Sequence, residues 1–443
     1  MTVRPDDDAA QAAVPAGARP ADGVAVPRPP GRAMSAARPP LIRAMNEQFL
    51  LSKIRELGPC SRADLARLSG LSKPTVSLAL AAVERAGLVR VAGQRTGLPG
   101  RSARLYEVRP EAGYVLGLDI GHLYVRGALA DLAGGVLASS ATRSRASSVR
   151  GRVAELIALA DGLCGDAGVA RADITQTVIG SPGVYDPRRN SMALTGGLPG
   201  WDRPAVLADL RAAFGQSLVV ENDVDAAALA ERDHGHGREA DDFAFVSVGS
   251  GIGMGLVVGG RLHRGMHGVA GEIAYLPMTG GGGGDEDDAR RRGPLEAAAS
   301  APAVVRAARR AGMRGPVSAQ RVFEAAAAGD ERAAAVVAAE AELVARLLCC
   351  VVTIVDPELI VLGGGVGQAP GFAAAVTREL ERIAPVMPEV RVSALGSEAV
   401  VRGCLAAGTE LAWGRLTATL PAAGPDEAAD GQLAPAGLAG LPG

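Results

Sequence analysis

The stretch of residues 61–87 is SRADLARLSGLSKPTVSLALAAVERAG. Ser61 and Asp64 have the spacing of a capping box, in which each side chain accepts a backbone N–H at the start of a helix. Gly70 ends that helix, because glycine adopts the left-handed conformation of a helix end without strain. Ser72 caps a second helix with a proline in its first turn, where no N–H is needed. The stretch therefore predicts two helices joined by a tight turn.

The flanking residues extend this pattern on both sides. Residues 46–57 predict a helix that ends at Gly58-Pro59, and residues 89–106 predict a hairpin with a glycine-rich tip. The side chains expected to form the core are Phe49, Leu50, Ile54, Leu57, Leu65, Leu68, Val76, Leu80 and Val83. Three helices followed by a hairpin are typical of a winged helix-turn-helix, which we assign to residues 41–110.

The charge of this region favours a nucleic-acid partner. Residues 1–110 carry 17 lysines and arginines against 9 aspartates and glutamates, in a chain whose formal net charge is −2. The second motif helix of such a domain enters the major groove by its N-terminal end, and an arginine between glycines suits a minor groove. The candidate DNA-binding residues are Ser72, Lys73, Thr75, Ser77, Arg95, Arg101 and Arg104. The alternative is a three-helix protein-interaction module with an ordinary Gly-Pro-Gly turn.

Composition limits the class of protein. The 443 residues are 48% hydrophobic, which is enough for two or three cores, so we expect a multidomain protein. The five cysteines lack the spacing of disulfides or zinc ligands, and no apolar run is long enough to span a membrane. A cytoplasmic protein without membrane contact is therefore expected. Residues 1–40 and 414–443 predict a disordered arm and tail, and residues 280–293 predict a flexible loop.

The remaining body, residues 113–413, begins with an apolar strand over residues 115–121 and a second strand over residues 124–131. Six further segments carry a resemblance to a known family: residues 179–186, 197–201, 221–231, 248–253, 268–273 and 356–365. In this order they resemble the ROK family (repressors, open reading frames and kinases). The resemblance covers about residues 46–413. It implies an α/β, actin-like ATPase (ribonuclease H-like) two-lobed sugar-kinase fold behind the all-α, winged helix-turn-helix domain.

The resemblance implies two sets of residues in the cleft between the lobes. The sugar-binding set is Asn222, Asp223, Glu272, Tyr275 and Glu296. The remnants of the nucleotide loops are Asp119, Gly121, Gly249, Gly251, Gly253, Gly363 and Gly364. Independently of any family, a carboxylate beside an amide, as in Asn222-Asp223, can accept hydrogen bonds from sugar hydroxyls. The same pair can instead cap the helix that follows, and Glu296 alone is typical of a solvated helix residue.

Two departures from the family pattern bear on function. Active ROK kinases carry Asp-x-Gly-Gly-Thr at the first phosphate loop, whereas this chain has Asp119-Ile-Gly-His-Leu123, which predicts that ATP does not bind. Tyr275 occupies the position of a zinc-binding histidine, and residues 280–293 contain no cysteine, so we expect no zinc and no other cofactor. No catalytic residue is therefore expected, although Asp223 would be the general base of an active kinase.

These features predict a transcription regulator, specifically a repressor of carbohydrate metabolism genes. Its partners would be double-stranded operator DNA and a sugar or sugar phosphate bound in the degenerate kinase cleft. A homodimer or homotetramer is expected, because palindromic operators match two-fold symmetry. The alternatives are an active ATP-dependent sugar kinase with an accessory DNA-binding head, and a regulator that responds to a protein partner.

Overall fold

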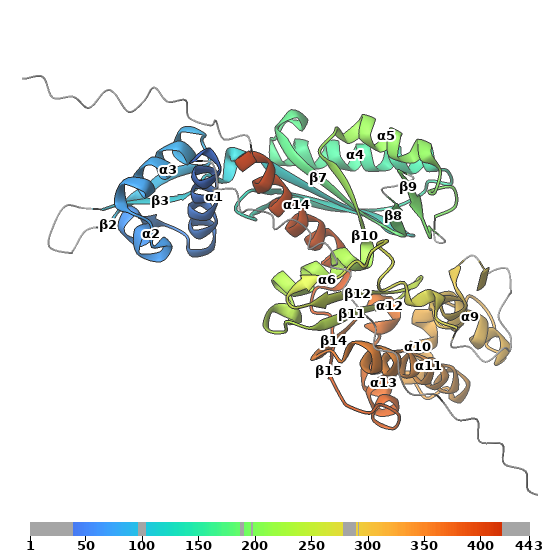
Figure 1. Cartoon of the computed structure of the whole chain (residues 1–443). Coiled ribbons are helices and arrows are strands. Elements are labelled where there is room, and N and C mark those ends of the chain that lie inside the picture. The colour runs from blue at the N-terminus through green and yellow to red at the C-terminus, as the bar shows by residue number, and fades with distance from the viewer. Residues whose placement is uncertain are drawn as a thin grey trace, which may run out of the picture.

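The computed structural model describes residues 39–95, 103–186, 190–195, 198–277, 289–290 and 292–418. Figure 1 shows an N-terminal head beside two lobes, each built on its own five-stranded sheet. The predicted two-lobed α/β fold behind a helix-turn-helix head is confirmed. No helix in the described ranges combines the length and the apolar composition needed to cross a membrane.

The head has the predicted order of elements. These are α1 (Pro39–Leu57), β1 (Cys60–Ser61), α2 (Arg62–Ser69), α3 (Lys73–Arg85), β2 (Val89–Arg95) and β3 (Ala103–Val108). Its three strands form one sheet in the order β1-β3-β2. The predicted caps are confirmed: Ser61 and Asp64 form a capping box, Gly70 has a φ of 68°, and the Ser72 hydroxyl accepts the N–H of Thr75.

Some details of the head differ from the prediction. Phe49, Leu57 and Leu68 are 41%, 51% and 41% exposed rather than buried. In α1 the buried face is centred between Leu50 and Leu51, which turns Phe49 toward solvent. α1 also begins at Pro39, inside the segment predicted as a disordered arm. The rest of that arm, the tip of the wing and most of the predicted loop over 280–293 lie outside the described residues.

The two lobes repeat one pattern of strand connections. The first sheet has the order β10-β7-β4-β5-β6 and the second has the order β13-β12-β11-β14-β15. In each sheet, three consecutive antiparallel strands are extended by two parallel strands. The strands of the first sheet are β4 (Tyr114–Ile120), β5 (Tyr124–Asp131), β6 (Val136–Arg143), β7 (Ile174–Ser181) and β10 (Leu218–Asn222). Those of the second are β11 (Phe243–Val248), β12 (Ile252–Val258), β13 (Arg261–Leu262), β14 (Leu359–Gly363) and β15 (Glu389–Val392).

Helices cover both sheets. The first lobe carries α4 (Val149–Ala167), α5 (Pro204–Phe214) and the small hairpin of β8 (Val184–Asp186) and β9 (Ser191–Ala193). The second lobe carries α8 (Pro294–Ala298), α9 (Ala301–Arg310), α10 (Ala319–Ala327), α11 (Glu331–Val355), α12 (Gly364–Gly367) and α13 (Phe372–Glu381). Two further helices, α6 (Asp223–His234) and α14 (Ala399–Ala418), pack against each other where the lobes meet (Figure 1). α14 ends beyond residue 414, where the sequence predicts a disordered tail.

The head is packed onto the first lobe rather than tethered to it. One cluster of buried side chains contains Ile54 and Tyr106 from the head together with Val115, Leu132 and Trp413 from the body. The connection between head and body is a single 3₁₀ turn (Pro110–Ala112), whose Pro110 carbonyl accepts the N–H of Leu132 at 3.1 Å. Because apolar side chains of both parts exclude water from one core, docking of the head stabilises both.

Candidate functional site

A cavity of about 550 Å³ lies between the two lobes. All five residues of the predicted sugar-binding set line it. Of the predicted nucleotide-loop residues, Asp119, Gly121, Gly249, Gly251, Gly253 and Gly364 also line it. Gly363 does not: it ends β14 beside the Phe245 ring, where a Cβ would lie 2.2 Å from the ring. The cavity therefore collects polar side chains from segments far apart in the sequence.

Asn222 is both a helix cap and a wall of the cavity. Its Oδ1 accepts the N–H groups of Val224 at 2.9 Å and Asp225 at 3.0 Å, which starts α6. Its Nδ2 donates to the carbonyl of Gly183 at 3.1 Å and so fixes the loop after β7. The capping role that the sequence allows is thus real, and it places this polar group at the cavity wall.

Three carboxyls, those of Asp223, Asp225 and Glu272, lie close together in the cavity wall. Burial raises the pKa of Asp223 to about 6 and, with the neighbouring Asp223 and Glu296 charges, raises the pKa of Glu272 to about 7. Asp225, which the sequence-based set omits, has its pKa raised to about 8 by burial and by Glu221. Such groups accept hydrogen bonds from hydroxyls, as a polyol ligand requires. When these carboxyls are ionised, their negative charge makes the binding of an anionic ligand group beside them unfavourable.

Glu296 and Tyr275 have different surroundings. The Glu296 Oε2 accepts the N–H of Ile252 at 3.0 Å, so it holds the loop between β11 and β12 rather than facing solvent. A Cβ at Gly251 would lie 2.6 Å from the same oxygen, which explains the glycine there. Tyr275, in the short turn Ile273–Tyr275, is 38% exposed, and burial together with Glu272 raises the pKa of its phenol.

Near Asp119 the cavity is lined by a cation of the protein itself, Arg126. The Arg126 Nη1 lies 3.1 Å from the buried Asp119 Oδ2, and the guanidinium stacks 5.2 Å from the Tyr124 ring. Burial and Asp223 raise the pKa of Asp119 to about 7, against the opposing effect of Arg126. His122 lines the cavity, and Leu123 is 57% exposed. The sequence-based set omits Arg126, although the pairing of the two predicted strands places it opposite Asp119.

The predicted DNA-binding residues that the structure describes divide into three groups. Lys73 and Arg104 are exposed. Ser72 and Thr75 hydrogen-bond each other at 2.8 Å at the start of α3, and Ser77 is half-buried. Arg95 lies 3.1 Å from Asp64, so the wing is joined to α2 by an ion pair. Arg101 lies outside the described residues.

The sequence-based set does not contain Leu78, an exposed apolar side chain of α3. Leu78 is 64% exposed on the outer face of α3, opposite the buried Val76, Leu80 and Val83. The helical period predicts this position, because a residue two places from both Val76 and Leu80 lies on the opposite face of the helix. An exposed leucine on this face is suited to an apolar contact with a partner.

The family assignment rests on the body of the chain. The ROK family model matches residues 115–407. The protein belongs to the ROK family. The MarR family model matches residues 44–92 of the head.

Relatives of this ROK protein include repressors and enzymes. The xylose repressor of Bacillus subtilis (strain 168) is 26% identical over 243 residues, which cover 55% of this chain and 63% of that protein. The putative xylose repressor of Caldicellulosiruptor sp. is 26% identical over 237 residues and is covered over 59% of its length. The bifunctional enzyme NanE/NanK of Brucella suis is 36% identical over 193 residues, 43% of this chain and 35% of that enzyme. The chain thus spans less than two thirds of the length of these relatives.

Solved structures agree with the fold. A ROK family transcriptional regulator, described as a homolog of the E. coli MLC protein, matches 85% of this chain and 98% of its own with a TM-score of 0.69 at 23% identity. A ROK hexokinase from Thermus thermophilus matches 66% of this chain and 97% of its own with a TM-score of 0.56 at 31% identity. The first match includes the head, whereas the second covers a share that corresponds to the lobes.

The part of the chain that the structure describes holds no group of three or more His, Cys, Asp and Glu side chains arranged to hold a metal. Residues 278–288 and 291, in the region where the sequence predicts loss of the family's zinc site, fall outside it. The absence of zinc from this ROK protein therefore stays a prediction.

Proposed function

We propose that this ROK protein is a DNA-binding transcription regulator, specifically a repressor of carbohydrate metabolism genes. In this proposal a sugar or sugar phosphate binds in the cleft and changes the affinity for operator DNA. The observation that carries the proposal is the packing of a helix-turn-helix head, with Lys73 exposed at the start of α3, onto the lobes that enclose a polar cavity. The xylose repressors among its relatives support the same class of function.

We further propose that the cleft binds its ligand without phosphorylating it, and without zinc or another cofactor. The first loop supports this, because His122, which lines the cavity, and the exposed Leu123 stand where the family pattern has the glycine and threonine that receive nucleotide phosphates. Two heads on a two-fold axis would fit a palindromic operator, so the active form in this proposal is a homodimer or homotetramer. The five cysteines, all free, are consistent with action in the cytoplasm.

The first experiment tests DNA binding. Duplexes are selected from a random pool by the full-length protein, and their affinity is measured over a range of salt concentrations for wild type, Lys73→Ala and Lys53→Ala. Lys53 is a matched control because it pairs with Glu56 within α1. We expect Lys73→Ala to weaken binding and to reduce the salt slope by about one, since one phosphate contact is lost. Failure to select any duplex, or an effect of Lys53→Ala equal to that of Lys73→Ala, would contradict the proposal.

The second experiment separates sensing from catalysis. Thermal unfolding with D-xylose, D-glucose and their phosphates identifies a ligand by a rise in Tm, because a ligand that binds the native state stabilises it. Release of ADP is then measured with the same sugars. We expect a Tm rise with at least one sugar and no ADP release above that of Asp223→Asn. Turnover that Asp223→Asn abolishes would instead establish a sugar kinase.

A further inference from the structure

Helix α14 extends from the cleft to the head. Ala399 and Val400, at its first turn, line the cavity between the lobes. Glu410 and Trp413, about three turns later, contact the head. The cleft and the head are thus connected by one continuous helix, visible in red in Figure 1.

At the cleft end, α14 is held tightly against α6. A Cβ placed on Gly403 would lie 1.6 Å from the Ala226 carbonyl oxygen, so the two helix backbones are in direct contact there. α6 begins at Asp223, directly after its cap Asn222, and both residues line the cavity. Packed helices move as rigid units, because close-packed interiors transmit displacement. A ligand that shifts the start of α6 must therefore shift α14 with it.

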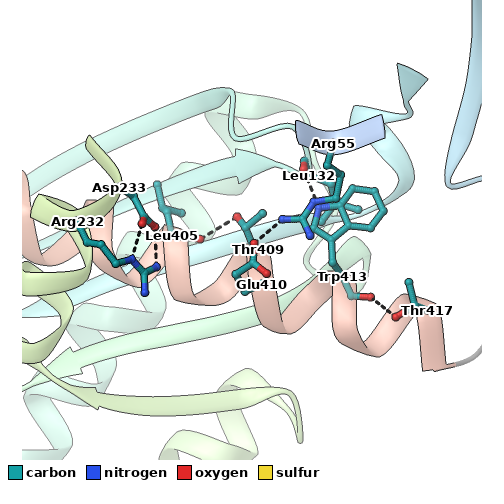
Figure 2. A network of polar contacts seen from close by, with 9 residues as sticks. All are labelled: Arg55, Leu132, Arg232, Asp233, Leu405, Thr409, Glu410, Trp413 and Thr417. Carbon is teal, nitrogen blue, oxygen red and sulfur yellow. Dashed lines mark hydrogen bonds and ion pairs between the residues drawn. The ribbon is translucent and has the colours of Figure 1, made fainter. Parts of the chain in front are cut away.

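At the head end, Arg55 of α1 makes a cation–π contact and an ion pair with α14. Trp413 is buried, and its Nε1 donates to the Leu132 carbonyl at 3.1 Å, which fixes the indole in the body. The Arg55 guanidinium of the head stacks 5.2 Å from this ring and pairs with Glu410 (Figure 2). The apolar core shared by head and body has no directional preference, and the hydrogen bond from Leu132 to Pro110 holds the connecting turn rather than α1. Arg55 therefore supplies a contact whose geometry depends on the angle of the head.

We propose that Arg55 is a positioning residue that sets the orientation of the DNA-reading head, and that α14 transmits ligand-dependent movement from the cleft to it. The part of this proposal that concerns DNA binding rests on the proposed function. The Arg55 side chain is 25% exposed and its partner Glu410 is 66% exposed. Partly exposed ion pairs and cation–π contacts are individually weak, so a small displacement of α14 suffices to open this one. The ligand then shifts the population between a held and a released head.

The chain offers a matched control on the same helix. Lys53 also lies over an aromatic ring, at 5.9 Å from the Phe49 centroid, and pairs with Glu56 at 2.6 Å. Both partners of Lys53 belong to the head, whereas both partners of Arg55 belong to the body. Arg55→Met and Lys53→Met therefore remove the same kinds of contact, but only Arg55→Met removes one between head and body.

The first test needs neither DNA nor sugar. Trp201 and Trp413 are the two tryptophans of the chain, so protein labelled with 5-fluorotryptophan gives two ¹⁹F resonances, which Trp201→Phe assigns. We expect Arg55→Met to shift or broaden the Trp413 resonance and to leave the Trp201 resonance unchanged. Lys53→Met should change neither. An unaltered Trp413 resonance in Arg55→Met would overturn the proposal.

The second test measures the response to ligand. Affinity for a selected duplex is compared with and without the sugar that raises the Tm. Couplings of this kind are typically about 5-fold to 150-fold, and we expect Arg55→Met to reduce the response below about twofold while Lys53→Met retains it. The Tm rise with sugar should be equal in all three proteins. A full response in Arg55→Met would overturn the proposal, whereas absence of DNA binding in wild type would refute the proposed function and leave the ¹⁹F result to decide the role of Arg55.

Discussion

The head and the cleft are built in opposite ways. The candidate residues of the head come from α3 and the adjoining wing, within a few tens of residues of chain, and their positions follow from caps and helical period. The cleft residues come from β4, the β10–α6 turn, the β11–β12 loop and helices further along, and two of them, Asn222 and Glu296, also hold part of the fold. Substitutions in the head should therefore affect one property, whereas substitutions in the cleft should affect stability and ligand binding together.

The largest expected effect is at Asn222. Asn222→Ala removes the cap of α6 and the hydrogen bond to Gly183, so we expect a loss of about 1 to 2 kcal/mol of unfolding free energy and a sugar affinity at least about tenfold lower. Calorimetric titration with the sugar and chemical denaturation measure the two effects.

Ser148→Ala is the control for this variant. Ser148 caps α4 by accepting the N–H of Gly151, away from the cavity. It should lower stability by a similar amount and leave sugar affinity intact. If both variants lowered sugar affinity equally, the loss in Asn222→Ala would come from lower stability and not from a role of Asn222 in the cleft.

The next effect is a pH dependence of opposite sign for stability and for binding. The pKa values of Asp223, Glu272 and Asp225 are raised in the folded state, so the folded state binds protons more tightly than the unfolded state. Stability from these groups is complete below about pH 4 and is lost as the pH rises through about 6 to 8. Sugar affinity should rise over the same range, because ionised carboxylates are the stronger acceptors.

Tm measurements from pH 5 to 8, with and without sugar, check both signs. Glu272→Gln should reduce the slope of stability with pH, since its amide does not titrate. A Tm of the free protein that rises steadily over this range would show that the cleft carboxyls are already neutralised by partners.

The smallest expected effect concerns one exposed side chain of the head. In the proposed complex Leu78 contacts a thymine methyl group in the major groove. Leu78→Ala should weaken binding to a selected duplex by about fourfold, the equivalent of roughly 0.8 kcal/mol for one buried methyl group. Replacing the contacted thymine by deoxyuridine should weaken wild type equally and Leu78→Ala no further. Additive losses would show that the leucine and the methyl group do not meet.

The same contrast explains how far the sequence could be interpreted. The caps at Ser61 and Ser72 and the buried stripe of α3 are local, and they were predicted correctly. The cleft residues could be grouped only through the resemblance to the ROK family, since nothing local connects Asp119 with Glu296. The Arg126–Asp119 pair is local, because the two residues are opposite each other in the β4–β5 hairpin, but its register was not predicted. The Arg55 contact with Glu410, which joins residues 355 positions apart, has no local signal and becomes apparent only when the helices are placed.

The shared core of head and body has a consequence for protein engineering. Cutting the chain after residue 110 would expose Ile54 and Tyr106 on one fragment and Val115 and Trp413 on the other, so neither fragment would keep its native surface. A chimera that carries a foreign DNA reader on these lobes must therefore supply a complementary apolar face, with an arginine opposite the indole. Recombination between distant family members is limited by how well the head and the body fit in this shared apolar core, as well as by the operator that each head recognises.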